Sequence, residues 1–94
     1  MLLTELGRLD EASAAYERAI ELSPSNPRFY YNLTQSKRMT RGDMRLGAME
    51  RLANDSGDLD ISERIDLDFA LAKAFADIGD AHRAFRHLSS GNEL

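Results

Sequence analysis

The chain has 94 residues, 43% of them apolar and 30% charged, which is enough for one small folded domain and unlike a disordered segment. Its formal net charge of −4 argues against nucleic acid or an anionic membrane as a partner, because both attract clustered Lys and Arg. It contains no cysteine, no secretory signal and no apolar run long enough to span a bilayer, so we expect a cytoplasmic protein without disulfides, thiolate chemistry or a cofactor.

Two helices are expected before residue 26. Leu2, Leu3 and Leu6 suggest a short first helix that stops near Gly7. The next helix carries apolar residues at three- and four-residue steps, which predicts one buried stripe formed by Leu9, Ala12, Tyr16, Ala19 and Ile20. Ser23-Pro24 is expected to end this helix.

The middle of the chain is predicted to hold two further helices. Asn26 before Pro27 is typical of an N-cap followed by proline in the first turn, which indicates a helix running to about Met39. Gly42 then reads as a helix stop, and Asp43 as the N-cap of a helix that reaches the linker at 54–61.

The last third is predicted to form a long helix and a final one. Asp60 and Glu63 have capping-box spacing, and the helix that follows to Ile78 is apolar around most of its circumference, so it should be buried on more than one side. Its polar interruptions are expected to mark the sides that stay wet: Asp66, Asp68, Lys73 and Asp77. Gly79-Asp80 repeats the stop-and-restart signal. Because no strand pattern competes, the predicted fold class is all-α.

The chain also repeats itself. The segment at 6–20 aligns without a gap with the segment at 78–92, and Gly42 falls between their glycines, which indicates units at 1–26, 27–57 and 58–94. Small residues such as Ala12 and Ala84 recur where a partner helix would have to come close, each followed one turn later by a larger residue.

These spacings resemble the tetratricopeptide repeat (TPR) family, whose unit is a helix-turn-helix of 34 residues. The residues that carry the resemblance are Gly7, Ala12, Tyr16, Ala19, Pro24, Tyr30 and Leu33, and again Leu71, Phe75, Gly79, Ala84 and Leu88. The resemblance implies an all-α, right-handed α-solenoid of antiparallel helix pairs, and a non-enzymatic protein-protein interaction module that binds a peptide segment or a partner domain in its concave groove.

The repeats depart from the family pattern in the middle unit, where Gly47, Arg51 and Asn54 stand at the places of Ala12, Tyr16 and Ala19. The first unit lacks most of a first helix and the last lacks a polar capping helix. We therefore expect a part of a longer protein, or self-association through uncapped ends. The final third is also similar to helical repeats that precede sulfotransferase domains in bacterial proteins, so a regulatory or structural segment of a larger enzyme is the alternative function.

The family resemblance implies a candidate binding site, because the first helix of each pair lines the concave face. The residues expected to grip an extended peptide or its terminal carboxylate are Arg28, Tyr31, Asn32, Gln35, Arg38 and Lys73. The alternative is that these side chains form an ordinary solvated surface.

No catalytic or metal site is expected. His82 and His87 are five residues apart on one helix and point in different directions, which favours solvated histidines over a shared metal. The acidic pairs Asp58/Asp60 and Asp66/Asp68 lack a calcium-loop pattern, so solvated or capping roles are expected for them.

Overall fold

The computed structural model describes residues 2–55, 57 and 59–93, with side chains from residue 8 onward. The described chain forms five α-helices and no strand, which confirms the all-α prediction. The helices are α1 (Leu2–Leu22), α2 (Pro27–Ser36), α3 (Met44–Asn54), α4 (Ile61–Asp77) and α5 (Ala81–Glu93).

The predicted helix starts are confirmed by their caps. The Asn26 side chain accepts a hydrogen bond from the Arg28 amide, with Pro27 in the first turn of α2, and Asp43 caps α3 in the same way. The capping box at α4 is complete, because the Glu63 amide donates to Asp60 at 2.8 Å and the Asp60 amide donates to Glu63 at 3.2 Å.

The two predicted glycine stops are also confirmed. Gly42 and Gly79 have φ angles of 84° and 85°, which are strained for any residue with a Cβ. Asp80, directly after Gly79, accepts a hydrogen bond from the Arg83 amide at 3.1 Å and so starts α5. Each stop-and-restart thus relies on a glycine followed by a capping carboxylate.

The expected break at Gly7 is wrong, because α1 continues through it as one helix of 21 residues. Gly42 and Gly79 are each followed by an aspartate that caps the next helix, whereas Gly7 is followed by Arg8, which has no oxygen to accept from the backbone. A glycine alone is tolerated inside a helix. The side chains of Leu2, Leu3 and Leu6, expected to pack a separate first helix, lie outside the described residues.

Helix α2 ends at Ser36, before the predicted Met39. Met39 leaves the helix to enter the core, and its amide donates to a carboxylate oxygen of Asp77 at 2.9 Å. Arg41 donates twice to the Ile78 carbonyl at the end of α4, where a cation also suits the helix dipole. The loop between α2 and α3 is therefore fastened to the C-terminal end of α4.

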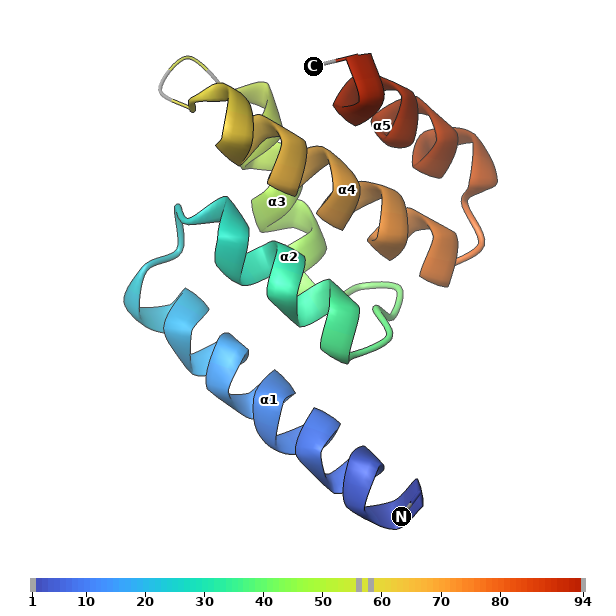
Figure 1. The fold of residues 1–94 in the computed structure, drawn as a ribbon. Helices are drawn as coiled ribbons and strands as arrows, with labels where there is room; N and C mark the ends of the chain where they lie inside the picture. The colour runs from blue at the N-terminus through green and yellow to red at the C-terminus, as the bar shows by residue number, and fades with distance from the viewer. Residues whose placement is uncertain (1, 56, 58, 94) are drawn as a thin grey trace.

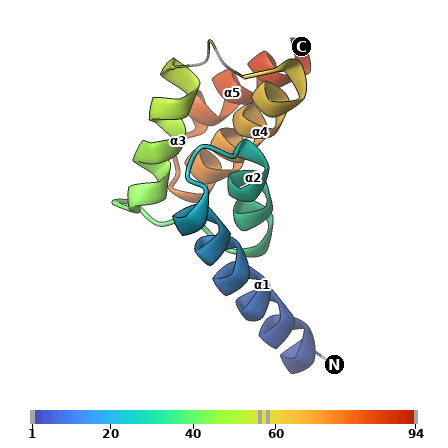
Figure 2. The ribbon, with the colours of Figure 1, turned by 90° about the vertical axis from the view of Figure 1, so that its left-hand side faces the viewer.

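The helices pack around α4. Figure 1 shows α1, α2, α4 and α5 side by side, with α2 and α4 running in one direction and α1 and α5 in the other. Figure 2, turned by 90°, shows α3 on one side of α2 and α4. The most deeply buried large side chains come from α2, α3 and α4, and they are Tyr30, Leu33, Met49, Leu71 and Phe75.

The acidic residues of α4 do not lie on solvent-exposed faces of the helix, which corrects the prediction. Asp68 is only 7% exposed, beneath α5, and Asp66 and Asp77 are largely covered by ion pairs with Arg28 and Lys73. Helix α4 has packed neighbours on several sides, so these acidic residues are covered by other helices or by ion pairs.

The principle of small residues at close contacts is seen most clearly at Gly91. A Cβ there would lie 3.0 Å from Cε1 of Phe69 and 3.3 Å from Cβ of Asp68, so α5 and α4 approach closely at this point. Ala84 and Tyr16 are half-buried against the core, as expected. Leu9 and Leu88, however, are each 44% exposed, because no described helix covers their side of the molecule.

Candidate functional site

Three surfaces of the described chain could bind a partner. The first is the predicted one, called here the α2 stripe, which consists of Arg28, Tyr31, Asn32, Gln35, Arg38 and Lys73. The spacing 28, 31, 32, 35 places four of these residues along one side of α2, while Arg38 lies in the following loop and Lys73 on α4. The structure thus brings four of the six together on one helix.

The cations of the α2 stripe are engaged within the chain. Nη1 of Arg28 lies 3.0 Å from Oδ1 of Asp66, and its guanidinium lies 5.3 Å from the centre of the Tyr31 ring. Nζ of Lys73 contacts both oxygens of Asp77 at 2.6 and 2.8 Å. Each partner carboxylate is well covered, so a ligand carboxylate would have to compete with these acids for the cations.

Arg38 belongs to the same end of the face as Lys73. Its Nη2 lies 3.5 Å from the carbonyl oxygen of Asp77, a long contact that leaves most of the guanidinium in solvent. Asn32 and Gln35 make no side-chain hydrogen bond with the described residues. The free polar groups of the α2 stripe are therefore mainly amides.

The second surface, the α4–α5 groove, was not predicted. It is a hollow of about 520 Å³ between the outer faces of the last two helices. Its walls come from two stripes with the same i, i+3, i+4, i+7 spacing: Phe69, Ala72, Lys73 and Ala76 on α4, and Ala81, Ala84, Phe85 and Leu88 on α5, with Gly79 between them. Phe85 is 69% exposed and Leu88 is 44% exposed, so adjoining large apolar side chains of the groove wall reach solvent.

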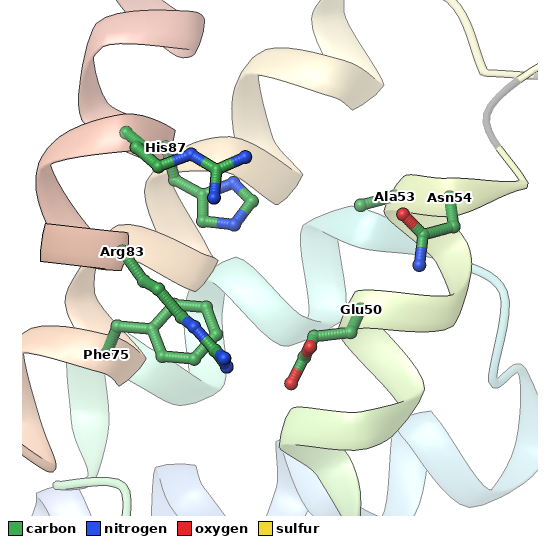
Figure 3. A pocket seen from close by; sticks show the side chains of 7 residues that line it. Glu50, Ala53, Asn54, Phe75, Arg83 and His87 are labelled. Atoms are coloured by element: carbon green, nitrogen blue, oxygen red, sulfur yellow. The ribbon is translucent and has the colours of Figure 1, made fainter. Parts of the chain in front are cut away.

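The third surface, the α3–α5 cleft, is a hollow of about 250 Å³ floored by α4. Figure 3 shows Glu50, Ala53 and Asn54 of α3 on one side and Arg83 and His87 of α5 on the other, with Phe75 of α4 beside Arg83. Arg86 of α5 completes the lining.

His87 is an ordered part of this cleft rather than a solvated histidine, which corrects the prediction. Its ring stacks on Phe75 with the centroids 5.6 Å apart and the planes inclined by 9°. Its Nδ1 lies 3.1 Å from Oδ1 of the buried Asp68, whose Oδ2 is buried without a hydrogen-bond partner among the described atoms. His82, in contrast, is exposed as expected.

Sequence reasoning missed these two surfaces for an identifiable reason. The apolar spacing of Ala81, Ala84, Phe85 and Leu88 is present in the sequence, but the repeat pattern predicts that Ala84 and Leu88 contact the paired helix. Arg83, Arg86 and His87 lie on another side of the same helix. A helix with an apolar face and a basic face does not bury both, so this pattern could have indicated that one of the two faces of α5 is exposed.

Within the described residues, no group of three His, Asp or Glu side chains is arranged to hold a metal ion. No helix in that part of the chain is long and apolar enough to cross a bilayer.

Comparison with known proteins identifies the first two helices. The family profile of the TPR repeat matches residues 2–36, a segment that contains α1 and α2. No curated protein and no solved structure matches the chain significantly. The predicted resemblance is therefore confirmed over this segment, and TPR repeats are in general non-catalytic modules that mediate protein–protein interactions.

Proposed function

Because residues 2–36 match a TPR repeat, we propose that the chain is a non-enzymatic protein-interaction module whose partner places an amphipathic helix in the α4–α5 groove. The observation that carries this proposal is the pair of facing apolar stripes, with Phe85 69% exposed at the groove wall. Exposed apolar patches of this kind are typical of interaction sites.

The repeat architecture itself suggests the shape of the occupant. Helix α4 packs against both α2 and α3, so the helix pair α2–α3 binds the helix that follows it in the chain. The helix pair α4–α5 offers an equivalent surface for one more helix. A helix with an apolar stripe at i, i+3, i+4 and i+7 would cover Phe85 and Leu88 while its other sides remain in solvent.

The charge of α5 suggests which residues should flank the apolar stripe of the partner helix. Helix α5 carries His82, Arg83, Arg86 and His87 and has no acidic residue before Glu93. At the groove rim, Lys73 is already paired with Asp77. A partner helix with Glu or Asp beside its apolar stripe would complement the basic α5, mainly by increasing the rate of association.

The α2 stripe remains a second candidate, as a site for an extended peptide. The supporting observation is that Asn32 and Gln35 make no hydrogen bond with described residues, so their amides can pair with a peptide backbone. Arg28, Tyr31, Arg38 and Lys73 would flank the peptide. Because Arg28 and Lys73 are already paired, we expect Asn32→Ala to weaken binding of peptides with free and amidated carboxyl termini equally, as measured by fluorescence anisotropy.

Two other readings of the α4–α5 groove follow from the sequence. In a larger enzyme, such as a bacterial sulfotransferase with preceding helical repeats, a flanking domain would occupy the groove. In an isolated chain, a second copy would do so and produce self-association through the uncapped end. The cytoplasm remains the proposed location, in keeping with the lack of cysteine.

The groove proposal is tested with a synthetic helical peptide that has an apolar i, i+3, i+4, i+7 stripe flanked by glutamates, and with a scrambled peptide of the same composition. We expect only the patterned peptide to bind, and Phe85→Ser to weaken its binding by about tenfold or more, because a central aromatic contact is lost. Met44→Ser is the matched control, since Met44 is 87% exposed on α3, outside the groove.

Equal binding of the two peptides, or equal loss in the two variants, would contradict a helix-binding groove. Sedimentation of the free chain over a range of concentrations tests whether a second copy of the chain occupies the groove. A dimer that Phe85→Ser dissociates would replace the proposed partner with self-association.

A further inference from the structure

The α3–α5 cleft lies on a different side of α5 from the groove, and the proposed function uses its arginines only as charges that speed association, not as contacts. Arg83, Arg86 and His87 face the cleft, whereas Ala84, Phe85 and Leu88 face the groove. The cleft volume of about 250 Å³ is suited to a single side chain or a small molecule. A ligand bound in the cleft would therefore be separate from the partner helix in the groove.

The floor and one wall of the cleft are held in place. Phe75 is 2% exposed, with the His87 ring stacked on it and the Arg83 guanidinium 5.6 Å from its centre. Asp68 holds the His87 ring through Nδ1, and Nε of Arg83 lies 3.5 Å from Asp80. Arg83 is thus oriented by its Nε and its planar face, which leaves its two terminal nitrogens to donate to a ligand.

Two other charged side chains that line the cleft have no partner among the described residues. Arg86 is exposed and makes no ion pair or hydrogen bond with any described residue. Glu50, on the opposite wall, likewise makes none, so Arg83 and Glu50 lie on opposite sides of the hollow without pairing with each other (Figure 3). The Asn54 amide supplies a further donor on the side of Glu50.

We propose that the α3–α5 cleft binds a single carboxylate, as presented by a Glu or Asp side chain on a peptide, between the guanidinium groups of Arg83 and Arg86. The guanidinium groups of Arg83 and Arg86 both line the cleft, and their N–H donors match the two oxygens of a carboxylate. Asp80 beside Arg83 and Glu50 on the opposite wall offset the charges of the two arginines, so a doubly charged phosphate gains little Coulomb attraction over a carboxylate.

The test is an NMR titration of the 94-residue chain at constant ionic strength. The probes are N-acetylglutamate N-methylamide, its neutral glutamine counterpart and inorganic phosphate. We expect saturable shifts of the Ala53, Asn54, Arg83 and Arg86 amide signals with the glutamate probe, and weaker binding of the other two. Thermal unfolding of each variant used below establishes that it is folded.

Charge substitutions on the two walls should act in opposite directions. Arg86→Gln is expected to weaken binding of the glutamate probe by about tenfold, because an ionic hydrogen-bond donor is lost, and Glu50→Gln to strengthen it about threefold, because a repelling charge is removed. Arg18→Gln, an exposed arginine on α1, changes the net charge as Arg86→Gln does and should leave the affinity unchanged.

Four results would overturn the proposal. They are the absence of saturable shifts at the cleft, tighter binding of phosphate than of the glutamate probe, an equal loss in Arg18→Gln and Arg86→Gln, and weaker binding in Glu50→Gln.

Discussion

At the scale of single residues, buried polar groups in this chain are matched to particular partners. Tyr30 is 1% exposed, yet its hydroxyl donates to the Pro24 carbonyl at 2.7 Å. Burial raises the pKa of Tyr30, opposed by the nearby Arg51 and Arg45, because the charged phenolate is poorly solvated in the core. One side chain thus fills the core and also fixes the turn between α1 and α2.

We expect Tyr30→Phe to lower the free energy of unfolding at neutral pH by about 1 kcal/mol, since it removes one hydrogen bond and leaves the ring in place. The raised pKa adds a pH dependence. The contribution of Tyr30 is fully present below its ordinary pKa of about 10 and is lost as the pH rises through the higher folded value.

Urea unfolding of wild type and Tyr30→Phe across the alkaline range measures this difference directly. The gap between the two proteins should narrow or reverse above pH ~10, because only the wild type must ionise or expose this phenol. A gap that stays constant with pH would show that Tyr30 does not titrate differently in the folded state.

At the scale of helices, Gly47 in α3 and Gly91 in α5 have distinct roles that their sequence neighbours do not reveal. Gly91 lies where α5 touches Phe69 and Asp68, while a Cβ at Gly47 in α3 would make only an ordinary contact of 3.5 Å with Arg51. Both are helical glycines, and each costs helix stability relative to alanine. Only the packing distinguishes the two positions.

These two positions allow a paired prediction. Gly47→Ala should stabilise the protein by about 0.5–1 kcal/mol through helix propensity alone. Gly91→Ala should destabilise it by about 1 kcal/mol, because the new methyl group must displace the Phe69 ring and the gain in propensity is small near the end of a helix. Chemical denaturation of both variants checks the opposite signs, and stabilisation by both would show that α5 can move away from α4 at little cost.

At the scale of the whole molecule, stability should be unevenly distributed. Helix α4 packs against α2, α3 and α5, and its end is tied to the α2–α3 loop through Asp77 and the Ile78 carbonyl. Helix α1, about 31 Å long, packs against the much shorter α2 and projects beyond it (Figures 1 and 2). Hydrogen bonds from Ser13 to Ser36 hold the two helices together near the end of α2.

We therefore expect the slowest hydrogen exchange in the middle of α4 and the fastest helical exchange at residues 2–9 of α1. Amides at 70–75 should exchange at least about a hundredfold more slowly than those in the first turns of α1, because opening α4 requires unpacking three neighbours. Exchange followed by NMR or mass spectrometry measures both segments in one sample. Similar rates in the two segments would indicate that the chain opens as a single unit.

The candidate sites were only partly predictable. The α2 stripe follows from helical spacing and the family resemblance, and α2 does carry four of its residues on one side. The pairing of Arg28 with Asp66 joins different helices, so no local pattern predicts it. The α4–α5 groove is encoded as an apolar stripe on α5, but a stripe shows only that a face is apolar and not whether the chain covers it.

By itself, the sequence determined the all-α class, the helix starts at Asn26, Asp43 and Asp60, and the turns at Gly42 and Gly79. These features depend on hydrogen bonds and backbone angles within a few residues, which the local sequence specifies. Only the tertiary structure decided that Asp68 and His87 are brought together, that Met39 leaves its helix, and that Phe85 remains exposed. Those outcomes depend on which helices lie beside one another, and that follows from the packing of the whole chain rather than from any one segment.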